Sequence, residues 1–284
     1  MGFVSKAQIG ALLVVVAASS PLFAQNIASD KHQTHASVPD GGQIARQSIA
    51  ATQRSWQALD HYTYTERDED RRLDSLGQLK SENADVTKMT LVNGARFEQL
   101  IEHNGQPPSA TEQRKSDQDL DKLKHETATE QAARLRQGQE NRAFLPEVLE
   151  AFDFDLVGEE IVDGRAAYVL QATPHPGYLA HGKYGKMFNK VEGKLWIDKQ
   201  DFGCIKIDGE VTQSFSVGLF AARVGRGSHI ILEQVSVGDA VWMLKRVEVR
   251  ASARIFFLKS LDVDRILNYS DYFATTDSAY SVNR

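Results

Sequence analysis

Two pairs of carboxylates are the side chains whose spacing comes closest to hydrolytic chemistry. Asp198 and Asp201 form one pair, and Asp153 and Asp155 form the other. Neighbouring carboxylates can share the general acid and general base roles of hydrolysis. Each pair is expected at a turn or at a strand edge, where aspartate commonly hydrogen-bonds to the nearby backbone. The sequence therefore predicts structural roles for both pairs and leaves a secreted hydrolase as a lesser alternative.

The histidines and the single cysteine add no second constellation. His32 and His35 fall in a polar segment that is a poor frame for a metal site. Cys204 is expected on the polar side of a strand with no partner base nearby in sequence, which favours an ordinary strand residue over a nucleophile. We therefore predict that the chain is not an enzyme and has no catalytic residue, metal site or cofactor.

The composition argues against nucleic-acid binding and excludes an internal disulfide. The chain has 284 residues, one cysteine and a net charge of −5. A mildly acidic chain offers no electrostatic attraction for nucleic acid. A single cysteine cannot form an internal disulfide, but a chain of this length can bury enough apolar surface to fold without one.

The first 24 residues resemble a secretory signal peptide. A basic Lys6 precedes an apolar run at 9–16, and small residues follow up to Ala24. The run is shorter than the ~20 residues that cross a bilayer, so we expect cleavage near Ala24 and no stable membrane span. The mature chain is then predicted to be periplasmic or secreted, with 25–42 as a disordered leader.

One amphipathic helix is predicted over 42–59, capped by Asp40. Its apolar residues recur at spacings of four and three, on a single stripe that should pack on a sheet. The residues of this stripe are Ala45, Ile49, Thr52, Trp56 and Leu59.

A helical insertion is predicted over 109–152. Ser109 and Glu112 form a capping box at the start of one long polar helix, and Gly138 is a plausible stop. This helix is either a solvated surface helix or a lid. The apolar helix at 144–152 that follows is a candidate cover for the sheet.

The remaining segments alternate in the period of two that is typical of half-buried strands. Short turns join them and no crossover helices separate them, which predicts an antiparallel meander of roughly ten strands that curls strongly. The fold class is therefore α+β, with one domain over 43–273 and a tail over 274–284. The predicted strands are 61–67, 86–92, 95–102, 155–162, 166–173, 193–198, 205–215, 228–235, 241–258 and 261–269.

The hairpin over 193–215 is the clearest of these patterns. Its turn lies at 198–203, and its strands alternate apolar with polar residues. We expect the inner face to carry Leu195, Ile197, Ile205 and Ile207. We expect the outer face to carry Lys206, Asp208 and Glu210.

This hairpin resembles a feature of the periplasmic lipoprotein carrier superfamily, the LolA, LolB and RseB-like proteins. The segment Gly-Lys-Leu-Trp-Ile-Asp at 193–198, the turn through Asp201 and the return strand at 205–207 carry the resemblance. The hairpin at 164–170 and the strand at 241–247 look like its flanking strands, so the match would cover about 45–272. The resemblance implies an incomplete barrel whose concave apolar face, covered by helices, binds acyl chains or an extended partner segment.

The function expected from this resemblance is carrying or sensing a lipid or a lipoprotein acyl chain. Such a site needs an unfilled apolar cavity, whereas the same residues can also fill an ordinary core. The candidate lining residues are Phe97, Ile101, Phe144, Leu145, Val148, Leu149, Tyr168, Leu170, Leu195, Ile197, Ile205, Ile207, Phe215, Met243 and Val247.

Two other functions compete with acyl binding. A regulatory sensor could hold a periplasmic partner protein, using an exposed tip at 218–227 where Leu219, Phe220 and Val224 stand beside Arg223 and Arg226. An outer-membrane barrel has a similar meander, but charged residues recur on one face of the longest predicted strand, which hydrocarbon would not accept.

Overall fold

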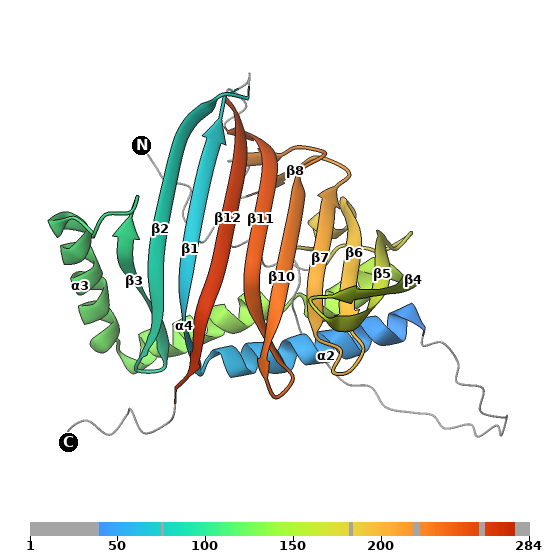
Figure 1. The fold of residues 1–284 in the computed structure, drawn as a ribbon, viewed down its shortest axis with the longest axis horizontal. Helices are drawn as coiled ribbons and strands as arrows, with labels where there is room; N and C mark the ends of the chain where they lie inside the picture. Colours follow the sequence, from blue (N-terminus) through green and yellow to red (C-terminus); the bar gives the residue numbers. More distant parts are fainter. Residues whose placement is uncertain (1–39, 75–76, 182–183, 218–221, 256–258, 276–284) are drawn as a thin grey trace.

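The computed structural model describes residues 40–74, 77–181, 184–217, 222–255 and 259–275. Ten strands form one antiparallel sheet in the order β3-β2-β1-β12-β11-β10-β7-β6-β5-β4, and β8 and β9 pair off this path (Figure 1). The two edges, β3 and β4, do not meet, so the sheet is not a closed barrel. The predicted fold class, α+β with an antiparallel sheet left open, is confirmed. The strands are β1 (Tyr62–Leu73), β2 (Leu79–Val92), β3 (Ala95–His103), β4 (Phe152–Val162), β5 (Arg165–Pro174), β6 (Val191–Asp198), β7 (Cys204–Val211), β8 (Phe215–Val217), β9 (Ala222–Val224), β10 (His229–Gly238), β11 (Val241–Ile255) and β12 (Lys259–Ala274).

The strand order differs from a simple meander at one place. β1 pairs with β12, so the first three strands join the sheet beside the last one. The helical insertion makes this order possible, because it carries the chain from the edge strand β3 to the opposite edge strand β4. β1 and β2 also extend further than predicted, since their charged residues continue the paired ladder from Arg67 to Leu73.

Helix α2 (Gly41–Leu59) lies on one face of the sheet. Its cap Asp40 accepts a hydrogen bond from the Gln43 N–H (3.3 Å), as the sequence predicts. The helix contacts β4, β7 and β11 and crosses the strands near one end of the sheet (Figure 1). Ile44 and Ala45 pack in one cluster with Ile207, Val247 and Leu267 of the sheet. We call the side that carries these residues the α2 face.

The polar insertion is two helices rather than one. α3 (Ala110–Lys124) begins at the predicted Ser109 capping box, and α4 (Ala128–Arg142) begins at a second capping box at Thr127. The second box restarts the helix, and Gly138 lies within α4 instead of ending it. Neither helix buries a residue, which agrees with the thin apolar stripe in the sequence. The short apolar helix α5 (Leu145–Ala151) follows as expected.

A β-bulge corrects the predicted faces of the hairpin. Ile197 pairs with Cys204 and Trp196 pairs with Lys206, so Ile205 is an extra residue in β7. Cys204 therefore lies on the α2 face beside Ile197, whereas Ile205 packs with Trp196 and Trp242 on the opposite face. The prediction that Ile205 is on the inner face is wrong, and so is the polar side assigned to Cys204.

Some expectations concern parts of the chain that are not described. The signal peptide and almost all of the leader precede residue 40, and Leu219 and Phe220 of the predicted contact patch also lie outside the described residues. Val224 of that patch is buried, because it packs in a core cluster with Phe215. Within the described ranges, no helix combines the length and apolar character needed to cross a membrane.

Candidate binding site in the apolar face of the sheet

The floor of the candidate site is a gap in the side chains of the α2 face. Along β6 and β7 the pairs on this face are Val191 with Val211, Gly193 with Gly209, and Leu195 with Ile207. The middle pair has no side chains, so the apolar row is interrupted at its centre. Across β7, Gly209 also pairs with Ile230 of β10. Two glycines at apolar positions therefore leave a hollow in this row of apolar side chains.

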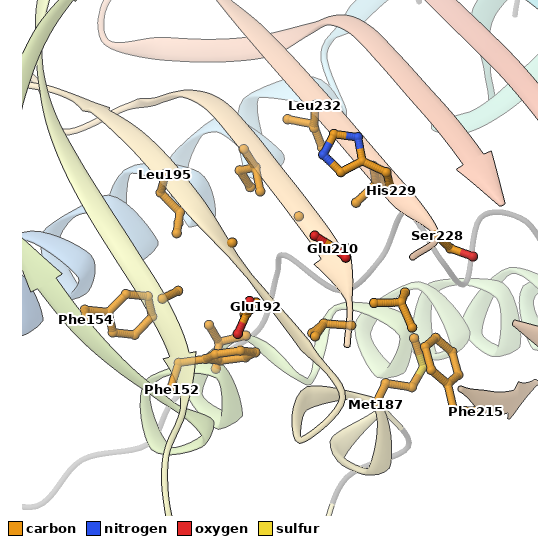
Figure 2. Close-up of a pocket in the computed structure, with 18 residues that line it drawn as sticks. Phe152, Phe154, Met187, Glu192, Leu195, Glu210, Phe215, Ser228, His229 and Leu232 are labelled. Atoms are coloured by element: carbon orange, nitrogen blue, oxygen red, sulfur yellow. The ribbon is translucent and has the colours of Figure 1, made fainter. Parts of the chain in front are cut away.

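A cavity of about 130 Å³ lies over this gap. Its walls come from β4, β5, β8 and β10 and from the helices α5 and α6 (Gly185–Phe188), which face the sheet. Figure 2 shows Phe152, Phe154, Met187, Leu195 and Phe215 around it. We call it the first cavity. Its walls are built almost wholly from carbon, which favours an apolar guest.

Charged residues border the first cavity but belong to the opposite face. Glu192 and Glu210 alternate with the two glycines along their strands, so their side chains project away from the α2 face. His229 pairs with Glu210 in register, and its Nε2 lies 2.6 Å from the Asp208 carboxylate on that outer side. The interior of the cavity is therefore left without a charged partner from these strands.

A second cavity, of about 120 Å³, lies between α2 and strands β10 to β12. Its lining includes Trp56 of α2 and a group of tyrosines, Tyr64, Tyr269 and Tyr272. The Tyr272 hydroxyl donates to the Leu244 carbonyl oxygen (2.8 Å). Burial raises the pKa of Tyr64 to about 12 and raises those of the other two tyrosines as well. These phenols stay protonated, so the second cavity is neutral but has hydrogen-bonding groups.

A buried carboxylate links the two helices, α5 and α6, that cover the first cavity. Glu147 of α5 accepts a short hydrogen bond from the Tyr178 hydroxyl and a longer one from the His181 N–H (3.3 Å). Burial first, and then the Glu147 carboxylate, raise the pKa of Tyr178. This contact ties the segment that precedes α6 to α5, so the two helices form one cover.

The predicted lining residues divide into groups. Four of them line the first cavity, namely Val148, Leu195, Ile207 and Phe215. Met243, together with Ile207, lines the second. Seven belong to the adjoining core clusters or pack against them, namely Phe144, Leu145, Leu149, Tyr168, Leu170, Ile197 and Val247.

Three predicted residues lie away from both cavities. Ile205 is on the opposite face, and Phe97 and Ile101 are in the distant edge strand β3. In β3, Arg96 reaches the Asp60 carboxylate at the end of α2 (2.8 Å), so its neighbour Phe97 points to the other side of the sheet. Ile101 lies beside a β-bulge and is exposed.

Asp198 and Asp201 have the structural role predicted for them, whereas Asp153 of the other pair lies 2.7 Å from the Nδ1 of His175. Asp198 accepts from the Arg165 guanidinium (2.6 Å) and from the Gln200 N–H (2.8 Å). Burial opposes its ionisation, but these donors hold the pKa of Asp198 below its usual range. Asp201 accepts from the indole N–H of Trp242 (2.9 Å). Within the described residues, no group of three or more His, Cys, Asp and Glu residues could hold a metal ion.

Sequence reasoning missed the two glycines. Gly193 and Gly209 occupy positions where the alternation calls for apolar side chains, between Val191 and Leu195 and between Ile207 and Val211. A Cβ at Gly193 would lie 2.4 Å from the Asp208 carbonyl oxygen, so close strand approach explains this glycine. A Cβ at Gly209 would lie 3.3 Å from the Ile230 methyl and in ordinary contact with the carbonyl oxygens of Glu192 (3.8 Å) and Ile230 (4.0 Å). Gly209 is therefore a glycine that packing alone does not demand.

No protein-family model matches this sequence, and no curated protein matches it. Among solved structures, the chain is similar to a DUF1329 family protein from Desulfovibrio piger (12% identity, TM-score 0.33, covering 86% of this chain and 96% of that one). It is also similar to a LolA superfamily protein from Nitrosomonas europaea (10%, TM-score 0.29, 84% and 95%). A third is an outer membrane lipoprotein-sorting protein domain from Vibrio parahaemolyticus (12%, TM-score 0.34, 82% and 94%).

At identities of 10 to 12% and TM-scores of 0.29 to 0.34, these similarities carry no argument about the family or the role of this chain. We therefore base the functional proposal on the cavities of this chain.

Proposed function

We propose that this protein is a non-enzymatic carrier or sensor that binds the acyl chain of a lipid or lipoprotein in the first cavity. The observation that carries the proposal is the hollow over Gly193 and Gly209 within a row of apolar side chains. A sheet face meant only as core would be filled to interior density.

The chemistry of the walls favours a hydrocarbon guest. Phe152, Phe154, Met187 and Phe215 surround the hollow with aromatic and thioether groups, and Met in particular adapts to guests of varied shape. Each methylene moved from water into such a site contributes about 0.8 kcal/mol. A charged or strongly polar guest would lose its hydration with no compensating partner inside.

The compartment follows from the N-terminal sequence. The features of residues 1–24 support export, with cleavage near Ala24, to the periplasm or outside the cell. A carrier in an aqueous compartment would shield an acyl chain from water on its way between membranes.

A regulatory module that holds a partner protein is the second candidate. Its support is the edge strand β4, where Val157 and Ile161 are 55% and 72% exposed. An unpaired edge with apolar side chains can add a strand from another protein. A secreted hydrolase is the weakest candidate, because Asp198 and Asp201 are occupied in the turn.

Native mass spectrometry of the full-length protein, purified gently from its own compartment, tests the proposal. Organic extraction of the same sample identifies any bound molecule. We expect a stoichiometric amphiphile with at least one acyl chain. A reproducibly empty protein that also fails to bind added fatty acids would contradict the carrier, and co-purification of one stoichiometric protein without lipid would favour the partner-binding module.

A further inference from the structure

The two cavities meet at a single pair of side chains. Ile207 and Leu232 line both the first and the second cavity. They are direct partners in register across β7 and β10, and they are 9% and 7% exposed. The pair therefore stands between the two voids on the α2 face, as a wall of two neighbouring side chains.

This wall can move more readily than the hydrogen-bonded tyrosine Tyr272 in the lining of the second cavity. Both side chains are aliphatic, so a change of rotamer breaks no side-chain hydrogen bond, and such changes are fast compared with ligand exchange. The void on each side provides the space into which a methyl group could turn. By contrast, Tyr272 on the far wall is held by its hydrogen bond to the Leu244 carbonyl oxygen.

The polarity of the two linings determines which cavity a guest would fill first. The first cavity has carbon walls, whereas the second has phenol, thiol and amide groups from Tyr269, Cys204 and Gln234. A hydrocarbon tail therefore gains most in the first cavity. Only a tail too long for the first cavity would continue past Ile207 and Leu232 into the second.

We propose that Ile207 and Leu232 form a partition that sets the chain-length preference of this protein. Short acyl chains end at the partition, and longer chains displace the two side chains and place their methyl end beside Cys204 and Met243. This inference rests on the proposed acyl-binding function and adds to it the residues that determine specificity.

A series of saturated fatty acids, from about 8 to about 18 carbons, tests the partition by their dissociation constants. In the unmodified protein we expect affinity to rise about fourfold per methylene until the first cavity is full, and less steeply beyond that length. In Ile207→Ala the steep rise should continue past that length. Ile207→Val, which folds with less disturbance, should show the same change to a smaller extent.

Photo-crosslinking adds a readout that affinity alone does not provide. Fatty acids with a diazirine at the methyl end should label first-cavity residues such as Phe152 when short, and Cys204 or Met243 when long. In Ile207→Ala, label should reach Cys204 at a chain length that stops in the first cavity of the unmodified protein. Ile205→Ala is the matched control, because Ile205 is in the same strand but on the opposite face.

Three results would overturn the partition. The first is an identical chain-length profile in the unmodified protein, Ile207→Ala and Ile207→Val. The second is an equal change of profile in Ile205→Ala, and the third is label that never reaches second-cavity residues at any length. If the unmodified protein binds no fatty acid at all, the acyl-binding function itself fails, whereas strong binding with an unchanged profile removes the partition alone.

Discussion

Two regions of the same sheet face have opposite ways of filling space. In the part of β1 and β12 beyond the tyrosines of the second cavity, the α2 face is filled by a buried ion pair in which Arg265 donates to Asp68 through its Nε (2.7 Å) and its terminal nitrogen. In β6 and β7, the same face has two facing glycines and a cavity of about 130 Å³. The space around this ion pair is filled although burying charge is costly, whereas the β6–β7 region is left open. The difference indicates that the hollow is a built feature of the face and not poor packing.

Breaking the ion pair between Asp68 and Arg265 should have the largest effect on the free energy of unfolding. Asp68→Ala leaves the Arg265 guanidinium buried without its carboxylate, and an unpaired buried charge costs about 3–5 kcal/mol of unfolding free energy. Urea unfolding at neutral pH measures the change. Replacing both partners with leucine is the control, since an apolar pair of similar volume should be close to neutral. A loss below about 1 kcal/mol for Asp68→Ala would show that this region is not filled as described.

Alanine substitutions at two leucines that pair across neighbouring strands compare the packed region with the hollow one. Leu170 and Leu195 are register partners on β5 and β6, but Leu170 is 0% exposed in the core whereas Leu195 lines the first cavity. Leu170→Ala should cost about 3 kcal/mol of unfolding free energy, because it creates a new void. Leu195→Ala should cost less, because it enlarges a void that already exists.

The same leucine pair separates stability from binding. Affinity for a medium-chain fatty acid should change in Leu195→Ala and stay constant in Leu170→Ala as long as the protein is folded. Calorimetric titration against both variants measures this. Equal unfolding costs and equal affinities in the two variants would contradict the distinction between a packed and a hollow region.

The sequence predicted the elements better than their arrangement. Alternation and turn residues located the strands, and Asp40 and Ser109 located helix starts, because these signals are local. The pairing of β1 with β12 joins segments about 200 residues apart and has no local signal. The bulge at Ile205 also depends on cross-strand register, which explains why Ile205 and the adjacent Cys204 were assigned to the wrong faces.

The candidate site was predictable in part for a similar reason. Apolar residues such as Val148 and Leu195 were identified because a binding surface and a core share the same composition. The cavity itself depends on what is missing at Gly193 and Gly209, and a missing side chain leaves only a gap in the alternation. A glycine facing a glycine at apolar positions of adjacent strands is the signal that would have located it.

Filling the hollow at Gly209 tests the central claim most directly. Gly209→Val places a side chain whose Cβ lies 3.3 Å from its nearest neighbour, the Ile230 methyl. Gly158→Val adds the same side chain to the edge strand β4, where a Cβ meets nothing within 4 Å. The measurement is the dissociation constant of a fluorescent fatty acid, with melting temperatures recorded for all three proteins.

We predict binding by the unmodified protein and by Gly158→Val, and affinity weaker by about tenfold or more in Gly209→Val, since the added methyl groups occupy the volume of the guest. Equal affinity in a folded Gly209→Val protein would contradict the claim that the hollow over Gly193 and Gly209 holds the acyl chain.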